Sequence, residues 1–207
     1  MIKFAGALSL LTVGLSVSAA TVYQHSGSGN FSYTGGQYGD EVVLAGTERV
    51  LTGFSFEYSA NFERAGGLTF SIYNQDGPLI DGSASPGSVL YSTTVDVVNG
   101  GGVVGIGFGY DPSNIIPDRF TYTVDFGTLG VGELAGLIVP GGSPSVGLSG
   151  NDFWEKTGPG ANDWALKNFG AGQTANFTAT VTAVPEPTTV AMMVGGAGLM
   201  LLALRRK

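Results

Sequence analysis

Hydrophobic and polar residues alternate with a period of two over much of the chain, and this alternation predicts β-strands. In the clearest run, Phe54, Phe56 and Tyr58 are separated by single polar residues. Between residues 21 and 183 no segment has a convincing helical period, so we expect this part to be built from strands. The other alternating runs are 68–72, 89–97, 104–110, 120–126 and 177–181, with weaker ones at 41–44 and 134–139.

Glycine-rich turn signals separate these runs and set the expected architecture. The turns lie at 65–67, 76–78, 81–82, 99–102 and 140–142. A sheet with one apolar and one polar face has to cover its apolar face with another layer. The pattern therefore predicts an all-β domain, a two-sheet antiparallel sandwich that is jelly-roll-like, with a barrel as the alternative.

The first twenty residues have the layout of a secretory signal peptide. Lys3 gives a positive start, an apolar run follows over 4–17, and Ser18 and Ala20 place small residues before a cleavage site. We therefore predict an N-terminal signal helix that is removed between Ala20 and Thr21. Cleavage one residue earlier also fits, and a buried N-terminal helix of the domain is the structural alternative.

The C-terminal segment, residues 184–207, combines a proline motif, an uncharged stretch and a basic cluster. As a helix, the stretch 188–204 is about 25 Å long, the short end of what crosses a bilayer. We predict a single transmembrane helix whose basic end stays cytoplasmic, after a signal peptide at 1–20 and a β domain at 21–183. The proline motif is Pro185, Glu186 and Pro187, and the basic cluster is Arg205, Arg206 and Lys207.

This order of features resembles the PEP-CTERM sorting signal of Gram-negative bacteria. The resemblance implies that an exosortase, a membrane enzyme with a Cys nucleophile, cuts near Pro185, Glu186 and Pro187. These three residues would be recognised by that enzyme and would not be catalytic in this chain. The resemblance also implies export to the cell surface or beyond, often in organisms that make extracellular polysaccharide. A plain membrane anchor that is never cleaved is the alternative, and it has the same topology.

The middle of the chain also resembles the β-sandwich ectodomains common in PEP-CTERM proteins, sometimes called choice-of-anchor domains. This second resemblance implies the fold and display at the surface, and it brings no known ligand. It rests on Phe54-Ser55-Phe56, Phe70-Ser71-Ile72-Tyr73, the stretch 86–91, Phe153-Trp154 and Trp164.

Charge and cysteine content narrow the function further. The middle region holds five basic and fifteen acidic residues, a net charge of −10. Such a surface repels phosphate backbones, so we expect no nucleic-acid partner. The chain has no cysteine, which excludes disulfides, thiolate metal sites and cysteine nucleophiles.

Residues that could serve in catalysis are sparse, and we expect that the protein is not an enzyme. The single histidine, His25, follows the predicted cleavage site closely, and mature N-termini are usually mobile, so we expect it to be solvated. Histidine-based triads and metal sites are therefore disfavoured. Two carboxylates across a cleft would suffice for glycoside hydrolysis. Glu57, Glu63 and Asp125 are candidates, but any acidic β protein offers such groups.

One loop gathers oxygen ligands of the kind that calcium accepts, namely Asn74, Asp76 and Asp81. The spacing is not that of an EF-hand, and Asx-Gly turns alone explain these residues. We expect no cofactor, with calcium at this loop as the alternative.

Two tryptophans, Trp154 and Trp164, follow Asn-Asp pairs. Exposed together, they would suit a sugar-binding surface. The favoured alternative is that they seal one end of the sandwich, because large aromatic side chains dominate core packing.

The sequence thus predicts a non-enzymatic exported surface or extracellular-matrix protein. Its expected partners are the secretion machinery, an exosortase and the inner membrane, which the C-terminal helix would span transiently. A carbohydrate-binding module acting on extracellular polysaccharide is the alternative.

Overall fold

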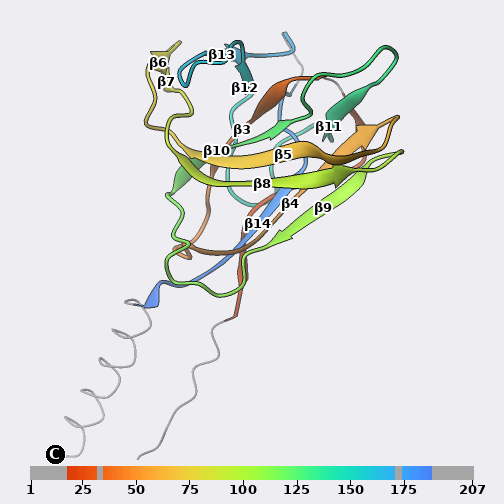
Figure 1. The fold of residues 1–207 in the computed structure, drawn as a ribbon. Helices are drawn as coiled ribbons and strands as arrows, with labels where there is room; N and C mark the ends of the chain where they lie inside the picture. Colours follow the sequence, from red (N-terminus) through yellow and green to blue (C-terminus); the bar gives the residue numbers. More distant parts are fainter. Residues whose placement is uncertain (1–17, 32–34, 171–173, 188–207) are drawn as a thin grey trace, which may run out of the picture.

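The computed structural model describes residues 18–31, 35–170 and 174–187, and its strands form two sheets that face one another (Figure 1). Every strand pairing is antiparallel. The first sheet contains β1 (Ala20–His25), β14 (Ala179–Val184), β4 (Val50–Ala60), β11 (Ala135–Val139) and β2 (Asn30–Phe31), with β9 (Gly102–Gly107) also paired to β4. The second sheet has the order β13 (Trp164–Lys167), β12 (Phe153–Lys156), β3 (Gln37–Val43), β10 (Arg119–Asp125), β5 (Arg64–Asn74) and β8 (Val89–Val97). A small hairpin, β6 (Leu79–Ile80) and β7 (Ser83–Ala84), stands apart from both.

Aromatic side chains from the two sheets meet in the core. Phe54 of β4 lies 4.7 Å from the ring of Phe70 on β5 and 5.0 Å from the ring of Tyr122 on β10, measured between centroids. Phe56 stacks on Phe70 at 5.5 Å, with the ring planes 10° apart. These contacts join strands of opposite sheets. The predicted antiparallel all-β fold and the facing of two sheets are therefore confirmed, and the jelly-roll connectivity stays a prediction.

The sandwich is open along one side, which distinguishes it from the barrel alternative. Among the described strands, β8 pairs only with β5 and β9 pairs only with β4, so each sheet ends there in an edge.

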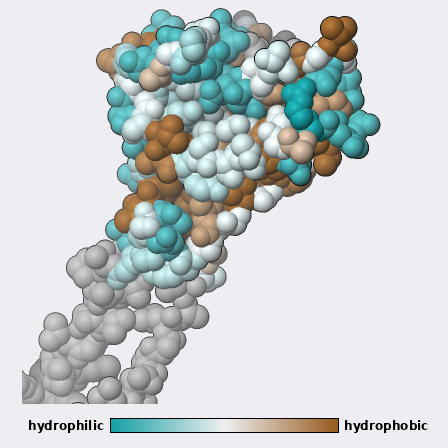
Figure 2. Space-filling model, viewed as in Figure 1, coloured by the Kyte–Doolittle hydropathy of each residue, from teal (hydrophilic) through white to brown (hydrophobic). Residues whose placement is uncertain are grey.

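The surface of the domain is mixed: hydrophobic side chains reach it at several points between hydrophilic ones (Figure 2).

Candidate functional site

The last strand, β14, delivers the Pro185-Glu186-Pro187 motif directly to the surface. Val184 is the final paired residue, and it lies opposite Val50 of β4 with only 4% of its surface exposed. Proline has no backbone N–H, so Pro185 cannot extend the ladder and the strand ends there. Pro185 and Glu186 are half-buried and Pro187 is exposed. No spacer residue therefore separates the folded sheet from the motif.

The start of the domain lies beside this end. Ala20 pairs with Ala183, and Thr21 pairs with Thr182, because β1 runs antiparallel to β14. The predicted signal cleavage between Ala20 and Thr21 stays a prediction. The pairing places that junction and the proline motif at the same end of the first sheet.

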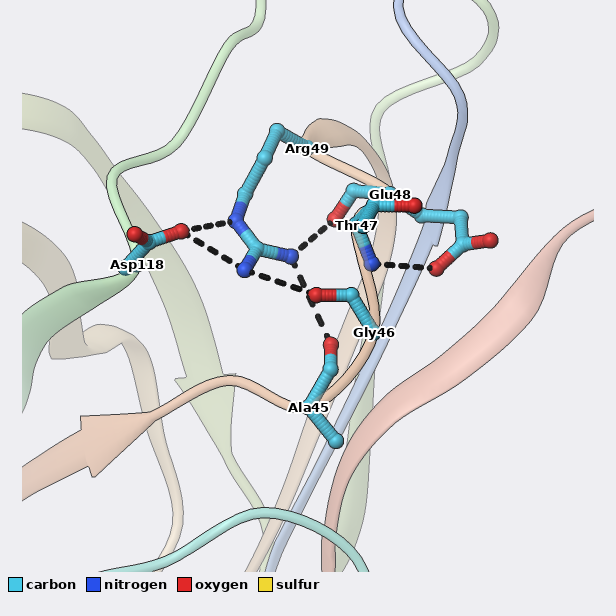
Figure 3. A network of polar contacts seen from close by, with 6 residues as sticks. All are labelled: Ala45, Gly46, Thr47, Glu48, Arg49 and Asp118. Carbon is cyan, nitrogen blue, oxygen red and sulfur yellow. Dashed lines mark hydrogen bonds and ion pairs between the residues drawn. The ribbon is translucent and has the colours of Figure 1, made fainter.

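A loop that precedes β4 at this end is folded around one guanidinium (Figure 3). Arg49 donates from Nε to Oδ1 of Asp118 at 2.6 Å and from Nη1 to the carbonyl oxygen of Glu48 at 2.7 Å. Nη2 donates to the carbonyl oxygen of Gly46 at 3.0 Å, and Nη1 also reaches that of Ala45 at 3.4 Å. We call residues 45–49 with Asp118 the exit platform, because Val50, the next residue, pairs with the end of β14.

The Arg49→Ala variant should lose about 1–3 kcal/mol of unfolding free energy, because backbone carbonyls lose a charged donor. The Asp118→Asn variant should lose less than about 1 kcal/mol, because the Asp118 side chain is 82% exposed and exposed ion pairs contribute little. The Arg49→Lys variant should be destabilised as well, since an ammonium group cannot reproduce the planar set of donors that the guanidinium offers. Urea denaturation of the three variants measures this, and equal losses at both positions would contradict the platform's dependence on the carbonyl contacts.

A buried carboxyl group lies deeper in the sandwich. Asp40 on β3 is fully buried, accepts a hydrogen bond from Ser149 Oγ at 2.8 Å on Oδ1, and faces the Phe177 N–H at 3.3 Å with Oδ2. None of the ion pairs between described residues includes it. Burial raises the pKa of Asp40 well above its ordinary value of 3.8, and the nearby Asp152 carboxylate adds to the rise. A carboxyl group enclosed in this way contacts no solvent, so we assign it a structural role.

The Asp40→Asn variant should become more stable than the natural chain as the pH rises. A raised folded-state pKa means that the stabilisation is complete below the unfolded-state value, near 3.8, and is lost as the pH rises through the folded-state value. Asparagine cannot ionise, and its amide can still accept from Phe177 N–H and donate to Ser149 Oγ. Thermal melts from pH 4 to pH 9 measure the difference. Asp152→Asn is the matched control, and its effect should be smaller. If the melting temperatures of Asp40→Asn and the natural chain changed with pH in the same way, the assignment would be refuted.

The prediction that His25 is solvated is wrong. The residue ends β1 and has 2% of its surface exposed, with Nδ1 at 3.3 Å from the Phe177 carbonyl oxygen and Nε2 at 3.2 Å from that of Gly141. The pairing of β1 with β14 fixes the N-terminal segment that we expected to be mobile.

Both tryptophans are buried, which removes the observation that motivated a sugar-binding surface. Trp154 has no exposed surface and Trp164 has 5%. The indole N–H of Trp164 donates to the Ala161 carbonyl oxygen at 3.0 Å, and Lys156 Nζ lies 4.4 Å from its ring centroid. These contacts agree with the structural alternative.

The oxygen-rich loop residues have local hydrogen-bonding roles. Asp76 accepts hydrogen bonds from Ser88 N at 2.7 Å and Ser88 Oγ at 2.6 Å, and Asn74 donates to the same hydroxyl oxygen at 2.9 Å. Asp81 (φ 50°) and Gly82 (φ 87°) form the two-residue turn of the β6–β7 hairpin, which requires positive φ at both positions. In the described part of the chain, no group of three or more His, Cys, Asp or Glu residues could hold a metal ion.

Other predicted features lie outside the described residues: most of the signal helix, the transmembrane helix over 188–204, and the basic cluster Arg205, Arg206 and Lys207. Within the described ranges, no helix has the length and apolar character needed to cross a membrane.

Comparison with known families identifies the C-terminal segment. Residues 183–207 match the PEP-CTERM protein-sorting motif. Neither the curated proteins nor the solved structures contain a match. The match starts at Ala183, inside β14, and so overlaps the strand that holds the tail to the domain. The chain therefore carries a PEP-CTERM protein-sorting motif joined without a spacer to the last strand of an all-β domain.

Proposed function

We propose that this chain is a non-enzymatic cell-surface or extracellular-matrix protein of a Gram-negative bacterium, whose tail an exosortase recognises and cleaves. The match of residues 183–207 to the PEP-CTERM protein-sorting motif carries the proposal, because that motif marks exported proteins sorted by an exosortase. In this proposal the secretion machinery exports the chain, and the segment 188–204 then holds it in the inner membrane with Arg205, Arg206 and Lys207 on the cytoplasmic side.

The geometry of the domain supports this proposal. The motif leaves the central strand β14 at the surface, beside the start of β1, so one end of the domain faces the membrane during both processing steps. The opposite end is then free to face outward. The fully buried Asp40 and the buried His25 serve the interior, and we assign neither a catalytic role. We do not propose the carbohydrate-binding alternative, because its two tryptophans are buried.

Mass spectrometry of the natural protein tests the proposal directly. The protein is recovered from membranes, cell surface and medium of two strains, one with its exosortase and one without. We expect an N-terminus at Thr21 in both strains and a new C-terminus near Pro185 only where the exosortase is present. Recovery of an intact tail in the outermost fraction of the exosortase-containing strain would contradict processing. A reaction product formed by the purified protein on cell-envelope glycans would contradict the non-enzymatic part.

A further inference from the structure

The strand β9 leaves a row of backbone hydrogen-bonding groups open at the edge of the first sheet. Phe108 N–H donates to the Thr52 carbonyl oxygen of β4 at 3.0 Å. Backbone groups in an antiparallel pair alternate in direction, so the even-numbered residues of β9 face β4. Val103, Gly105 and Gly107 therefore point their N–H and C=O groups away from the sheet, where no described strand pairs with them.

This edge lacks the usual protection against pairing with another chain. Natural edge strands are blocked by charges, prolines or bulges. No charged residue or proline occurs between Asp96 and Asp111, the β4–β9 register has no shift, and Val103 is 71% exposed. The neighbouring edge strand β8 differs, since it carries Asp96 and its register with β5 shifts twice.

Two of the three glycines of β9, Gly105 and Gly107, are not required by the fold. A Cβ atom added at Gly105 or Gly107 would have no neighbour within 4 Å, and neither residue has a left-handed φ. Glycine weakens a strand, and inside one it often marks a place where another backbone approaches closely. One short strand, β9, thus combines three features: unpaired backbone groups, no charged side chain, and two glycines that the fold does not require.

We propose that β9 is an interface at which a second copy of this chain adds its own β9 in antiparallel orientation. A twofold axis at Gly105 sets Gly105 opposite Gly105 of the partner subunit, and Val103 opposite Gly107 of the partner subunit. Each such facing pair exchanges two backbone hydrogen bonds, and the first sheets of the two molecules become one continuous sheet.

The uncharged β9 edge is where charge repulsion opposes contact between two copies least. The domain between residues 21 and 183 carries a net charge of −10, so two copies repel over most of their surfaces. Self-pairing of β9 brings no charged residue opposite another. A strand of six residues buries less than a standard protein interface, so the association depends on concentration.

Cysteine cross-linking of the full chain in detergent tests the register, since the natural chain has no cysteine. The Gly105→Cys variant should form a disulfide-linked dimer, because facing residues lie about 5.5 Å apart between Cα atoms, within disulfide range. Gly107→Cys is the matched control on the same strand and face, and it should cross-link at least about tenfold more slowly. A mixture of Gly107→Cys and Val103→Cys chains should instead form the mixed dimer. Equal rates for Gly105→Cys and Gly107→Cys, or a rate no faster than for Val131→Cys in an exposed loop, would overturn the proposal.

A charge exchange in the Gly105→Cys background separates specific pairing from random collision. Val103→Lys with Gly107→Lys places like charges opposite each other in both flanking pairs and should reduce cross-linking about tenfold or more. Val103→Lys with Gly107→Glu places opposite charges there and should restore it. All these positions are exposed, so thermal melts should show intact folds. Equal cross-linking by the two charge variants would refute the antiparallel register.

Discussion

Replacing Pro185 and Pro187 by alanine should abolish C-terminal processing while the β domain stays folded. The motif follows the last paired residue, Val184, and lies at the surface, where another enzyme can contact it. Two prolines hold the segment extended. Alanine removes this constraint, and the new N–H at position 185 lets β14 continue past its natural end. We expect the processed fraction, measured by mass spectrometry of the C-terminus in an exosortase-containing strain, to fall below detection.

Two further variants show whether the loss reflects recognition. Thr188→Ser with Thr189→Ser changes two residues directly after the motif and should be processed normally. Insertion of Gly-Gly-Ser between Val184 and Pro185 supplies a spacer that the natural chain lacks, and it should be processed at least as fast as the natural chain. If the double proline variant were processed at the natural rate, the motif would have no role in recognition.

Phe54→Ala should cost about 3–5 kcal/mol of unfolding free energy. The Phe54 side chain is 2% exposed and lies between the sheets, with ring contacts to Phe70, Phe120 and Tyr122. Alanine removes most of its apolar surface and leaves a cavity that the facing rings cannot fill without moving. Because β4 pairs with β14, β9 and β11, the loss weakens the strand that joins much of the first sheet.

Urea denaturation measures this loss, and Ser55→Ala is the matched control. Ser55 is the next residue on β4 and points to the other face of the sheet, so its change should stay within about 0.5 kcal/mol. The slope of free energy against urea should be unchanged in both variants. A loss of unfolding free energy below about 1 kcal/mol for Phe54→Ala would show that packing of this ring between the sheets contributes little to stability.

Alternation in the sequence predicts the long strands because one sheet face is buried. In β4 the inward residues Phe54, Phe56, Tyr58 and Ala60 are buried and the residues between them are not, whereas β10 is buried on both faces from Phe120 to Val124. The expected run to Tyr110 extends too far: β9 ends at Gly107, Gly109 has a left-handed φ of 63°, and Tyr110 is 61% exposed. Periodicity does not predict β12 and β13, because each has four residues and too few alternations.

Some features of the site can be predicted from contiguous residues, and others depend on contacts between residues far apart in the sequence. The proline motif is read from contiguous residues, whereas the exit platform depends on Asp118, which lies 69 positions after Arg49. His25 is buried because β1 pairs with β14. A local sequence pattern does not reveal that pairing, so the prediction of a solvated side chain is wrong. Asp40 could have been found, because it shares its strand face with Tyr38 and Val42, both of them buried.

The position of β14 between β1 and β4 also determines how the domain bears mechanical load. A pull on the tail enters at Val184 and acts along the axis of the strand. The hydrogen bonds to both neighbours run across that axis, so the pull loads them in shear and all of them share the force. Attachment through an edge strand pulled sideways would break its bonds one after another. The central last strand therefore makes a firm tether for as long as the tail remains attached.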